Sequence, residues 1–493
     1  MFLPSIGLEI HTELKTKNKM FCSCLNDPEE ERPNVNICPI CLAHPGVLPT
    51  INKEAVEKVI KVGLALNSKI SKFSKFDRKN YFYPDLPKGY QISQYDAPLC
   101  VGGSLNNVSI RRIHLEEDTG RLIHGKDFSL VDFNRAGVPL MELVTEPDIK
   151  SAAEALSFVK ELQLILRYLN VSDADMEKGQ LRIEVNISVQ PEISNFKSQT
   201  PNKLGTKVEI KNLNSFRAVG EAIGYEIQRQ KNLLEKGEKI IQETRGWDDK
   251  KKITVSQRLK EESHDYRYFP EPDLPPLDLE KFDLDNLRRE LPELPTQKRE
   301  RFIKEYGLLP KQVEILVVDR FAAEFFEEAA SELKIQNPKS KFQTLYNYLT
   351  SDLFGLVSQA KIGYSELKIR YIERPAHYKD LKITPENFAE LINIIDKGEI
   401  STRTAKDILK IMFETGRDPS EIIETEGLKQ ISDESGIIEI VKKVISENQK
   451  AVEDYKKGKE NALQFLIGRA MSELKGRANP KILEELFKKE LKD

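Results

Sequence analysis

Two stretches of the chain alternate between apolar and polar residues, and this alternation constrains the fold more than any other feature. In residues 6–14 the even positions are mostly apolar, and the odd positions include Glu9, His11 and Glu13. Residues 181–189 repeat the pattern in the opposite register. Because successive side chains of a strand point to opposite faces, each run predicts a β-strand with one buried and one polar face. Strands of this kind are typical of antiparallel sheets.

A third run, residues 207–211, has the same alternation. If the three strands share a sheet, its polar face carries acids such as Glu184, together with a histidine, an arginine and lysines. Such a surface suits a metal–nucleotide complex better than an apolar ligand. The alternative is an ordinary solvated sheet face, which has the same pattern. The placement of His11 between two acids favours a cation site, since hard cations take oxygen ligands and a histidine can add one nitrogen.

Length and composition limit the class of protein. The chain has 493 residues, of which 39% are hydrophobic and 31% charged, and this predicts a soluble protein of about three domains. No apolar run approaches the roughly 20 residues of a membrane helix, and the N-terminus lacks the pattern of a signal peptide, so we expect a cytoplasmic location. The net charge is −3, so any contact with nucleic acid requires a local basic surface.

Four of the five cysteines cluster in the sequence, as a C-x-C pair followed by a C-x-x-C pair; they are Cys22, Cys24, Cys38 and Cys41. In a cytosolic chain this spacing favours a metal site over disulfides, and four thiolates favour tetrahedral zinc. Because all four positions would be filled by cysteine, such a zinc would be structural. Free buried cysteines and a redox role are the alternatives. Cys100 stands alone and is expected to be a small core residue.

The secondary-structure pattern changes once along the chain. Residues 1–294 mix strands, helices and long loops, and the sequence is helical almost throughout afterwards. Helices are predicted over residues 53–67, after a capping box that begins at Ser151, and after caps at Ser215 and Thr384. The predicted fold class is therefore α+β, with a largely antiparallel sheet flanked by helices and followed by an all-helical region.

Charged residues next to a loop rich in aromatic residues suggest phosphoryl transfer. Arg78 and Lys79 precede that loop, and three consecutive acids occupy residues 116–118. Cations that neutralise phosphate oxygens, beside acids that hold a divalent ion, are the usual parts of such a site. A solvated run of charges is the alternative. The chain contains neither a Walker-type phosphate loop nor a kinase-type glycine loop, so any ATP site belongs to a different fold.

Several long runs resemble the B subunits of the aspartyl/glutamyl-tRNA amidotransferases. These runs are residues 6–16, 75–96, 113–122, 131–148, 181–189, 205–216 and 265–277. The similarity extends along the chain and ends in a tail that resembles the YqeY family. It implies a cradle-like catalytic (kinase) domain with a zinc clip over residues 1–294, a helical domain over 295–415 and a YqeY-like tail over 416–493. In this division residues 345–493 together form the family's C-terminal unit.

The resemblance also implies an activity, cofactors and partners. In that family the B subunit transfers the γ-phosphate of ATP to the side-chain carboxylate of Glu-tRNA(Gln) or Asp-tRNA(Asn). Ammonia that the glutaminase (the A subunit) releases from glutamine then displaces the phosphate, and the C subunit completes a heterotrimer. A non-catalytic tRNA-binding scaffold is the second reading, and a nucleotide-binding regulator is disfavoured because phosphate loops are missing. Which of the two tRNAs is the substrate is left open.

The family's site residues can be carried over by position. The resemblance assigns magnesium to Glu9, His11, Glu117 and Glu184, of which Glu184 has the least certain role. Lys79 matches a lysine at the phosphate-transfer site, with Arg78 and Tyr81 as further ATP-binding candidates. Glu9, Glu184 and Lys79 are the predicted catalytic residues. Some relatives lack the four cysteines, which supports a structural role for zinc. The tail offers basic candidates for tRNA phosphate contacts, namely Lys456, Lys457, Lys459, Arg469, Lys475 and Arg477.

Overall fold

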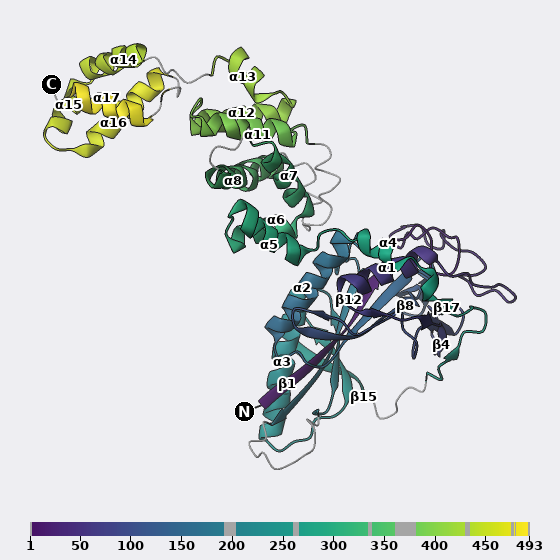
Figure 1. The fold of residues 1–493 in the computed structure, drawn as a ribbon. Coiled ribbons are helices and arrows are strands. Elements are labelled where there is room, and N and C mark those ends of the chain that lie inside the picture. Colours follow the sequence, from purple (N-terminus) through teal and green to yellow (C-terminus); the bar gives the residue numbers. More distant parts are fainter. Residues whose placement is uncertain are drawn as a thin grey trace. The chain divides into compact units, whose positions relative to one another are not determined.

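The structure is a computed structural model, and it divides the chain into two compact units, Met1–Pro295 and Thr296–Asp493. The residues that it describes are 2–191, 204–259, 266–333, 338–359, 381–428, 434–474, 478 and 480–491. The first unit is built around a large sheet and the second unit is helical in its described part (Figure 1). The predicted α+β class is therefore confirmed. The further division of the helical part at residue 415 stays a prediction.

The three alternating runs lie next to one another in the large sheet of the first unit. Its strands follow the order β15 (Ile253–Leu259), β14 (Glu243–Asp248), β13 (Val208–Leu213), β12 (Leu181–Pro191), β1 (Phe2–Glu13), β11 (Pro139–Thr145), β8 (Val108–Glu117), β6 (Cys100–Val101) and β2 (Lys69–Ile70), and β7 (Ser104–Leu105) pairs with β8. Only the β13–β14 pair is parallel, and the other pairs in the sheet are antiparallel. The sheet is thus largely antiparallel, as the alternation predicted.

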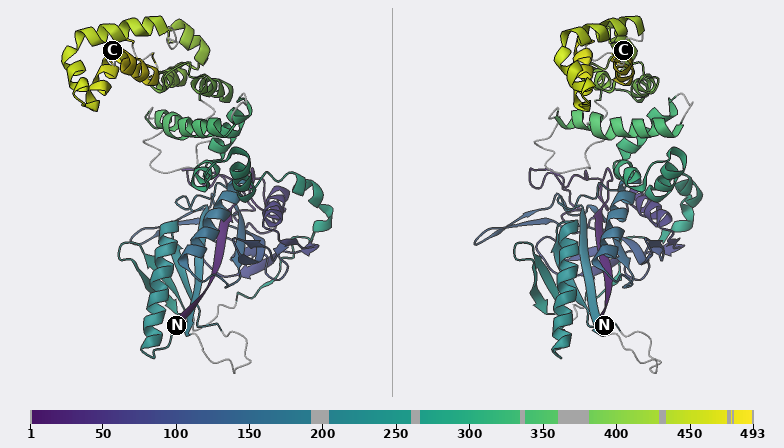
Figure 2. Two further views of the ribbon diagram at one scale, coloured as in Figure 1. Left: turned by 60° about the vertical axis from the view of Figure 1, so that its left-hand side comes forward. Right: turned by 90° about the vertical axis from the view of Figure 1, so that its left-hand side faces the viewer.

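The apolar face of this sheet forms the core of the unit. Ile6, Leu8 and Ile10 of β1 are at most 1% exposed, and the alternate apolar residues of β12 are at most 3% exposed. Helices α1 (Lys53–Ala65), α2 (Ala152–Tyr168) and α3 (Phe216–Glu235) pack on this face, and Figure 2 shows the two long helices side by side along the strands. Burial of apolar area at about 25 cal/mol per Å² is the main stabilising contribution here.

The starts of α2 and α3 follow from the cap residues. The hydroxyl of Ser151 accepts a hydrogen bond from the amide of Glu154, and the hydroxyl of Ser215 accepts one from the amide of Ala218. Each bond satisfies an amide that has no partner within the helix, which is typically worth about 1 kcal/mol. A 3-10 helix, η1 (Leu279–Lys281), and α4 (Leu284–Arg289) end the unit.

Short strands complete the first unit outside the large sheet. They form the sets β16 (Phe269–Pro270), β4 (Asp77–Asn80) and β5 (Tyr90–Ser93); β17 (Leu277–Asp278) and β3 (Phe73–Ser74); and the hairpin β9 (Arg121–His124) and β10 (Ser129–Asp132). The β5 strand packs against β8 of the large sheet. The polar face is therefore covered at this point, whereas an ordinary solvated sheet face, the alternative interpretation of the alternation, would be open to water.

The second unit is a series of helices. They are α5 (Pro295–Tyr306), α6 (Pro310–Val318), α7 (Arg320–Ser331), α8 (Pro338–Asn347), the π-helix η2 (Tyr348–Leu353), α9 (Phe354–Gln359), α11 (Pro385–Asp396), α12 (Thr402–Thr415), α13 (Pro419–Thr425), α14 (Glu434–Glu447), α15 (Gln449–Lys456), α16 (Glu460–Glu473) and α17 (Pro480–Glu490). Thr384 caps α11, and Pro385 occupies its first position, as predicted. Helices α14, α16 and α17 share an apolar core of their own.

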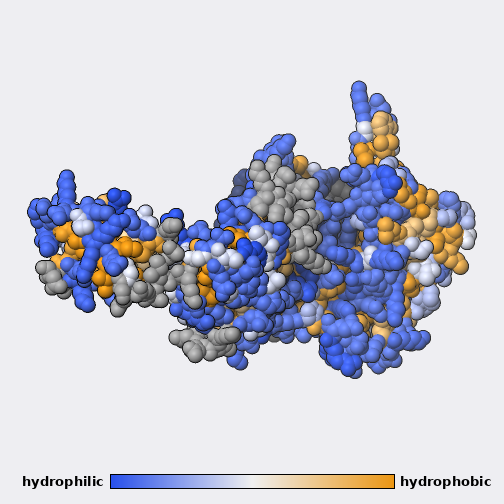
Figure 3. Space-filling view, turned by 90° about the horizontal axis from the view of Figure 1, so that it is seen from above, coloured by the Kyte–Doolittle hydropathy of each residue, from blue (hydrophilic) through white to orange (hydrophobic). Residues whose placement is uncertain are grey.

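Hydrophilic residues cover most of the face seen in Figure 3, with smaller apolar patches between them. Within the described part of the chain, none of the helices is both long enough and apolar enough to cross a bilayer.

Candidate metal and phosphate site

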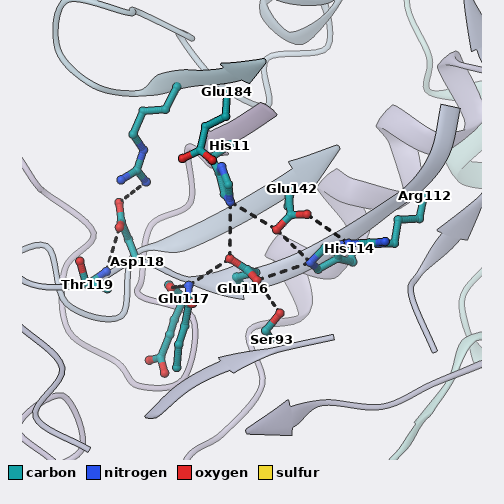
Figure 4. Close-up of polar contacts among 12 residues, drawn as sticks. His11, Ser93, Arg112, His114, Glu116, Glu117, Asp118, Thr119, Glu142 and Glu184 are labelled. Carbon is teal, nitrogen blue, oxygen red and sulfur yellow. Dashed lines mark hydrogen bonds and ion pairs between the residues drawn. The ribbon is translucent and has the colours of Figure 1, made fainter. Parts of the chain in front are cut away.

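Acids and histidines from three neighbouring strands meet on the polar face of the large sheet. Glu9 and His11 come from β1, and Glu142 of β11 pairs with His11 across the strands. One ligand atom from each of these three residues lies within 4.8 Å of the others, and His114 and Glu116 of β8 form a second such group with Glu142. Figure 4 shows His11, His114, Glu116 and Glu142 directed toward one another. The arrangement brings together oxygen and nitrogen ligands that could share one divalent ion.

Glu142 and Glu116 bridge the two imidazole rings. The Nε2 atom of His11 lies 3.3 Å from an oxygen of Glu142 and 3.8 Å from an oxygen of Glu116. The Nε2 atom of His114 lies 3.4 Å from Glu142 and 3.5 Å from Glu116. Arg112 adds an ion pair with Glu142 at 3.4 Å. The two carboxylates are therefore balanced by positive partners on several sides.

Burial makes these charges interact strongly. Glu116 is 2% exposed and Glu142 5% exposed. The β5 strand accounts for part of this burial, because the side-chain amide of Gln91 and the hydroxyl of Ser93 both donate hydrogen bonds to Glu116. Buried charges are stable only when they are paired or bind a cation. The cluster is thus a feature of the folded core and differs from a solvated sheet face.

The cluster shifts the pKa values of its members. Burial alone would lower the pKa of His114, but the carboxylates of Glu142 and Glu116 outweigh it and raise this pKa to about 9. The pKa of His11 is raised in the same way, against the effect of burial. Burial and the charge of Glu142 raise the pKa of Glu9 to about 7, although His11 opposes this. The site therefore holds protons near neutral pH that a bound cation would displace.

The positive charge of Lys79, which lies in β4, interacts electrostatically with this cluster. Burial opposes the charge on Lys79, but the carboxylate of Glu116, with Tyr268 and Glu142, raises its pKa. Its ammonium also lies 5.3 Å from the ring centre of Tyr266. Tyr81, which was predicted to bind ATP, packs edge-on against Tyr266, so it lies on the same side as Lys79. The charge of Lys79 thus interacts with those of Glu116 and Glu142, as a cation that binds a phosphate group over the acids would.

Glu184 neighbours the cluster without being one of its closest members. It faces Glu9 across the β1–β12 pair, and its charge contributes to the raised pKa of Glu9. Lys211 of β13 holds its carboxylate at 2.8 Å. The structure therefore places Glu184 beside Glu9, with its own cationic partner.

Glu117 and Arg78 do not join the other predicted site residues. Glu117 lies apart from the cluster in Figure 4, because adjacent residues of β8 point to opposite faces. Its carboxylate pairs with Lys88 at 2.6 Å. Arg78 forms two hydrogen bonds of 2.7 Å with the carboxylate of Glu271, and is turned away from Lys79 by the same alternation along β4. The structure therefore places Glu117 and Arg78 outside the group formed by Glu9, His11 and Glu142, and their assignment to the site stays a prediction.

The sequence indicated Glu116 only as one of the three acids of residues 116–118, and it did not indicate Glu142 or His114 as candidates, although it carries a signal for each. Glu142 interrupts a strongly apolar run of residues 140–144, and a buried strand tolerates an acid only with a partner. The alternation in residues 113–117 places His114 and Glu116 on one face and Glu117 on the other. The period of two would thus have favoured Glu116 over Glu117.

The four clustered cysteines come together in the structure, and their Sγ atoms lie within 4.8 Å of one another. Cys41 lies 3.4 Å from Cys22 and 3.6 Å from both Cys24 and Cys38. A tetrahedron of sulfurs at the usual Zn–S distance of about 2.3 Å has edges of about 3.8 Å, so the spacing fits such an ion. A hydrogen bond from Cys22 lowers the pKa of Cys41 to about 4, with a contribution from Lys19. Cys100 is buried in the core, apart from this group.

The basic candidates of the tail lie at its surface where they are described. Lys456, Lys457 and Lys459 are exposed around the end of α15, and Arg469 is exposed on α16. Arg469 lies over the ring of Phe465 at 5.9 Å from its centre. Lys475 and Arg477 fall outside the described residues.

Comparison with known proteins connects these features to one family. A model of the GatB/GatE catalytic domain matches residues 4–285, and a model of the GatB domain matches residues 324–491. The chain is 47% identical to a protein of Caldicellulosiruptor bescii over 99% of this chain and 98% of the relative. It is 47% identical to one of Persephonella marina over the whole of both chains, and 48% identical to one of Thermotoga maritima over 99% and 98%. All three relatives are named as the B subunit of aspartyl/glutamyl-tRNA(Asn/Gln) amidotransferase, and the chain belongs to this family.

Proposed function

We propose that this chain is the B subunit of a tRNA-dependent amidotransferase and that its first unit carries out an ATP-dependent phosphorylation. The substrate is the side-chain carboxylate of Glu-tRNA(Gln), of Asp-tRNA(Asn), or of both. Ammonia from a glutaminase partner then replaces the phosphate and gives the amide. The observation that carries this proposal is the cluster of Glu9, His11 and Glu142, whose ligand atoms lie within 4.8 Å of one another. The charge of Lys79 interacts with the acids of this cluster.

The chemistry explains why such a cluster is needed. A carboxylate resists attack by ammonia because oxide is a poor leaving group, whereas phosphate is a good one. The protein has to align the attacking carboxylate with the γ-phosphorus and to neutralise the charge of the phosphate oxygens. Lys79 supplies a fixed positive charge for those oxygens, with Tyr81 and Tyr266 packed beside it.

Magnesium is the cation that fits the acids. Glu9, His11 and Glu142 are the residues that would hold it, with Glu116 and His114 close by and Glu184 beside Glu9. When bound, magnesium would neutralise charge on the phosphate oxygens that develops during transfer. The burial of Glu116 and Glu142 keeps water away from one side of the site, which would protect an acyl phosphate from hydrolysis.

The remaining parts of the chain support binding and assembly. Cys22, Cys24, Cys38 and Cys41 would hold a structural zinc ion, which leaves no open position for catalysis. The exposed lysines around the end of α15 offer contacts to tRNA phosphates. The A (glutaminase) and C subunits of a heterotrimer are the expected protein partners, because the relatives are named as the B subunit of an amidotransferase.

The test uses the chain assembled with candidate A and C subunits. Lys79→Met removes the charge that faces the acids, and Lys72→Met is the matched control, because Lys72 is an exposed lysine paired with Glu280. Amide formation on each misacylated tRNA is followed with and without ATP, together with glutaminase activity and tRNA affinity. We expect Lys79→Met to abolish ATP-dependent amide formation while tRNA binding and glutamine hydrolysis persist. Normal amide formation would favour the alternative of a non-catalytic tRNA-binding scaffold.

A further inference from the structure

Lys19 is a fully buried lysine that the site described above does not use. Its exposed fraction is 0%, the lowest of any lysine among the described residues. The ammonium lies 3.8 Å from the Sγ atom of Cys41 and 3.2 Å from the carbonyl oxygen of Phe133. Within the described part of the chain, no carboxylate lies within ion-pair distance of it. A charge without an anion is costly at such a depth, and the sulfur of Cys41 is the group in contact with the ammonium that can carry a negative charge.

The backbone around Lys19 fixes the side chain in this position. The amide of Lys19 donates a hydrogen bond to the carbonyl of Cys24, inside the cysteine loop. The side-chain amide of Asn52, which caps α1, donates to the carbonyl of Lys19. Lys19 is thus tied to the cysteine loop on one side and to the start of α1 on the other.

A third segment closes over the aliphatic part of the side chain. Gly137 has φ +84°, and a Cβ atom at this position would lie 3.7 Å from Cδ of Lys19. The carbonyl of Gly137 accepts a hydrogen bond of 2.7 Å from Met20, and its amide donates to the carbonyl of Asp118, just beyond β8. The segment from Phe133 to Gly137 therefore covers Lys19 and also connects to the end of the strand that carries Glu116.

We propose that Lys19 is the buried counter-charge of the four-cysteine centre and that it joins this centre to the segment from Phe133 to Gly137. A zinc ion bound by four thiolates carries a net charge of −2, which the ammonium of Lys19 partly neutralises through Cys41. Conversely, the metal keeps negative charge on the sulfurs that face Lys19, so the two groups depend on each other. This inference rests on the zinc ion proposed above.

The test compares two lysines that are two residues apart. Lys19→Met keeps an unbranched side chain that is one atom shorter and removes the charge, and Lys17→Met is the matched control at an exposed position. The full chain is loaded with zinc, and its apparent zinc affinity is measured by competition with a chromogenic chelator. Residues that support metal ligands typically contribute 10–100-fold to metal affinity, so we expect Lys19→Met to bind zinc about 10–100-fold more weakly and Lys17→Met to be unchanged. The rate at which an alkylating agent releases zinc should rise in Lys19→Met alone, because a thiolate that loses a hydrogen-bond donor is more nucleophilic.

A measurement on the natural sequence keeps the inference testable if Lys19→Met does not fold. An amine-reactive label is applied to the full chain before and after zinc removal, and the peptide that contains Lys19 is quantified. Labelling of Lys19 should increase at least several-fold after zinc removal, while labelling of Lys17 stays constant. Equal zinc affinity in Lys19→Met, or a Lys19 that stays unlabelled without zinc, would overturn the inference. A natural chain that holds no zinc would instead refute the zinc proposal.

Discussion

Replacement of Glu142 by glutamine should destabilise the first unit in a strongly pH-dependent way. Glu142 lies 3.3 Å from His11 and 3.4 Å from both His114 and Arg112, and it is 5% exposed. Glu142→Gln keeps the shape of the side chain and removes its charge. The two imidazole rings then lose the carboxylate that they share.

The magnitude follows from His114. Its pKa is raised from 6.5 to about 9, and at 1.36 kcal/mol per pKa unit the proton on His114 stabilises the folded state by up to about 3 kcal/mol. Because the pKa is higher in the folded state than in the unfolded state, this contribution is complete below pH 6.5 and is lost as the pH rises through 9. Glu116 provides part of the shift, so Glu142→Gln should cost about 2 kcal/mol at pH 6.5 and much less at pH 9.

The chain contains a suitable reporter, because its single tryptophan, Trp247, lies in β14 of the same unit and is 7% exposed. Denaturant unfolding is followed by tryptophan emission at several pH values between 6.5 and 9, with a chelator present to exclude cations. Glu146→Gln is the control, since Glu146 forms an exposed pair with Arg111 and such pairs contribute about 0–1 kcal/mol. A difference between Glu142→Gln and the natural chain that is absent at pH 6.5, or that stays constant up to pH 9, would refute the reasoning.

Three further predictions test the site and the tail. The affinity for Mn²⁺, measured by electron paramagnetic resonance, should rise between pH 6 and pH 8, because Glu9, with its pKa of about 7, must lose a proton to bind a cation. An Mn²⁺ affinity that does not change over this pH range would argue against Glu9 as a ligand. Glu116→Gln should weaken Mn²⁺ binding at least tenfold, whereas Glu117→Gln should change the Mn²⁺ affinity by no more than about twofold. Glu117→Gln should instead lower the free energy of unfolding by about 3 kcal/mol, because it breaks the buried ion pair between Glu117 and Lys88. A chain that ends at residue 415 should bind tRNA more weakly in filter binding while the assembled complex still hydrolyses glutamine, and unchanged tRNA affinity would contradict the role given to the tail.

The elements that the sequence predicted correctly are those with a strong local period. The alternation in β1, β12 and β13 reflects one buried and one polar face, which is a property of each strand by itself. The helix starts at Ser151, Ser215 and Thr384 were equally predictable, because a cap bond forms between residues three apart.

The pairing of strands from distant segments was harder to predict. Nothing local in residues 139–145 indicates that β11 lies between β1 and β8, yet this order is what brings Glu142 to His11 and His114. The cover that β5 provides over Glu116 also depends on a contact between separate segments. The sequence predicted the types of residue in the site, whereas the sheet order decided which of them meet.

The charge balance of the cluster explains why a site of this kind can exist in the absence of its substrates. Three carboxylates, those of Glu9, Glu116 and Glu142, would repel one another in a buried position. The carboxylates raise the pKa of His114 to about 9 and also raise the pKa of His11, and the pKa of Glu9 is raised to about 7, so these groups favour a proton in the cluster. A divalent cation can replace this positive charge without a large change in the net charge of the core. The folded unit therefore keeps these side chains in place by itself, and the energy needed to assemble acids at one point is provided by folding, as the proposed binding of a cation and a nucleotide would require.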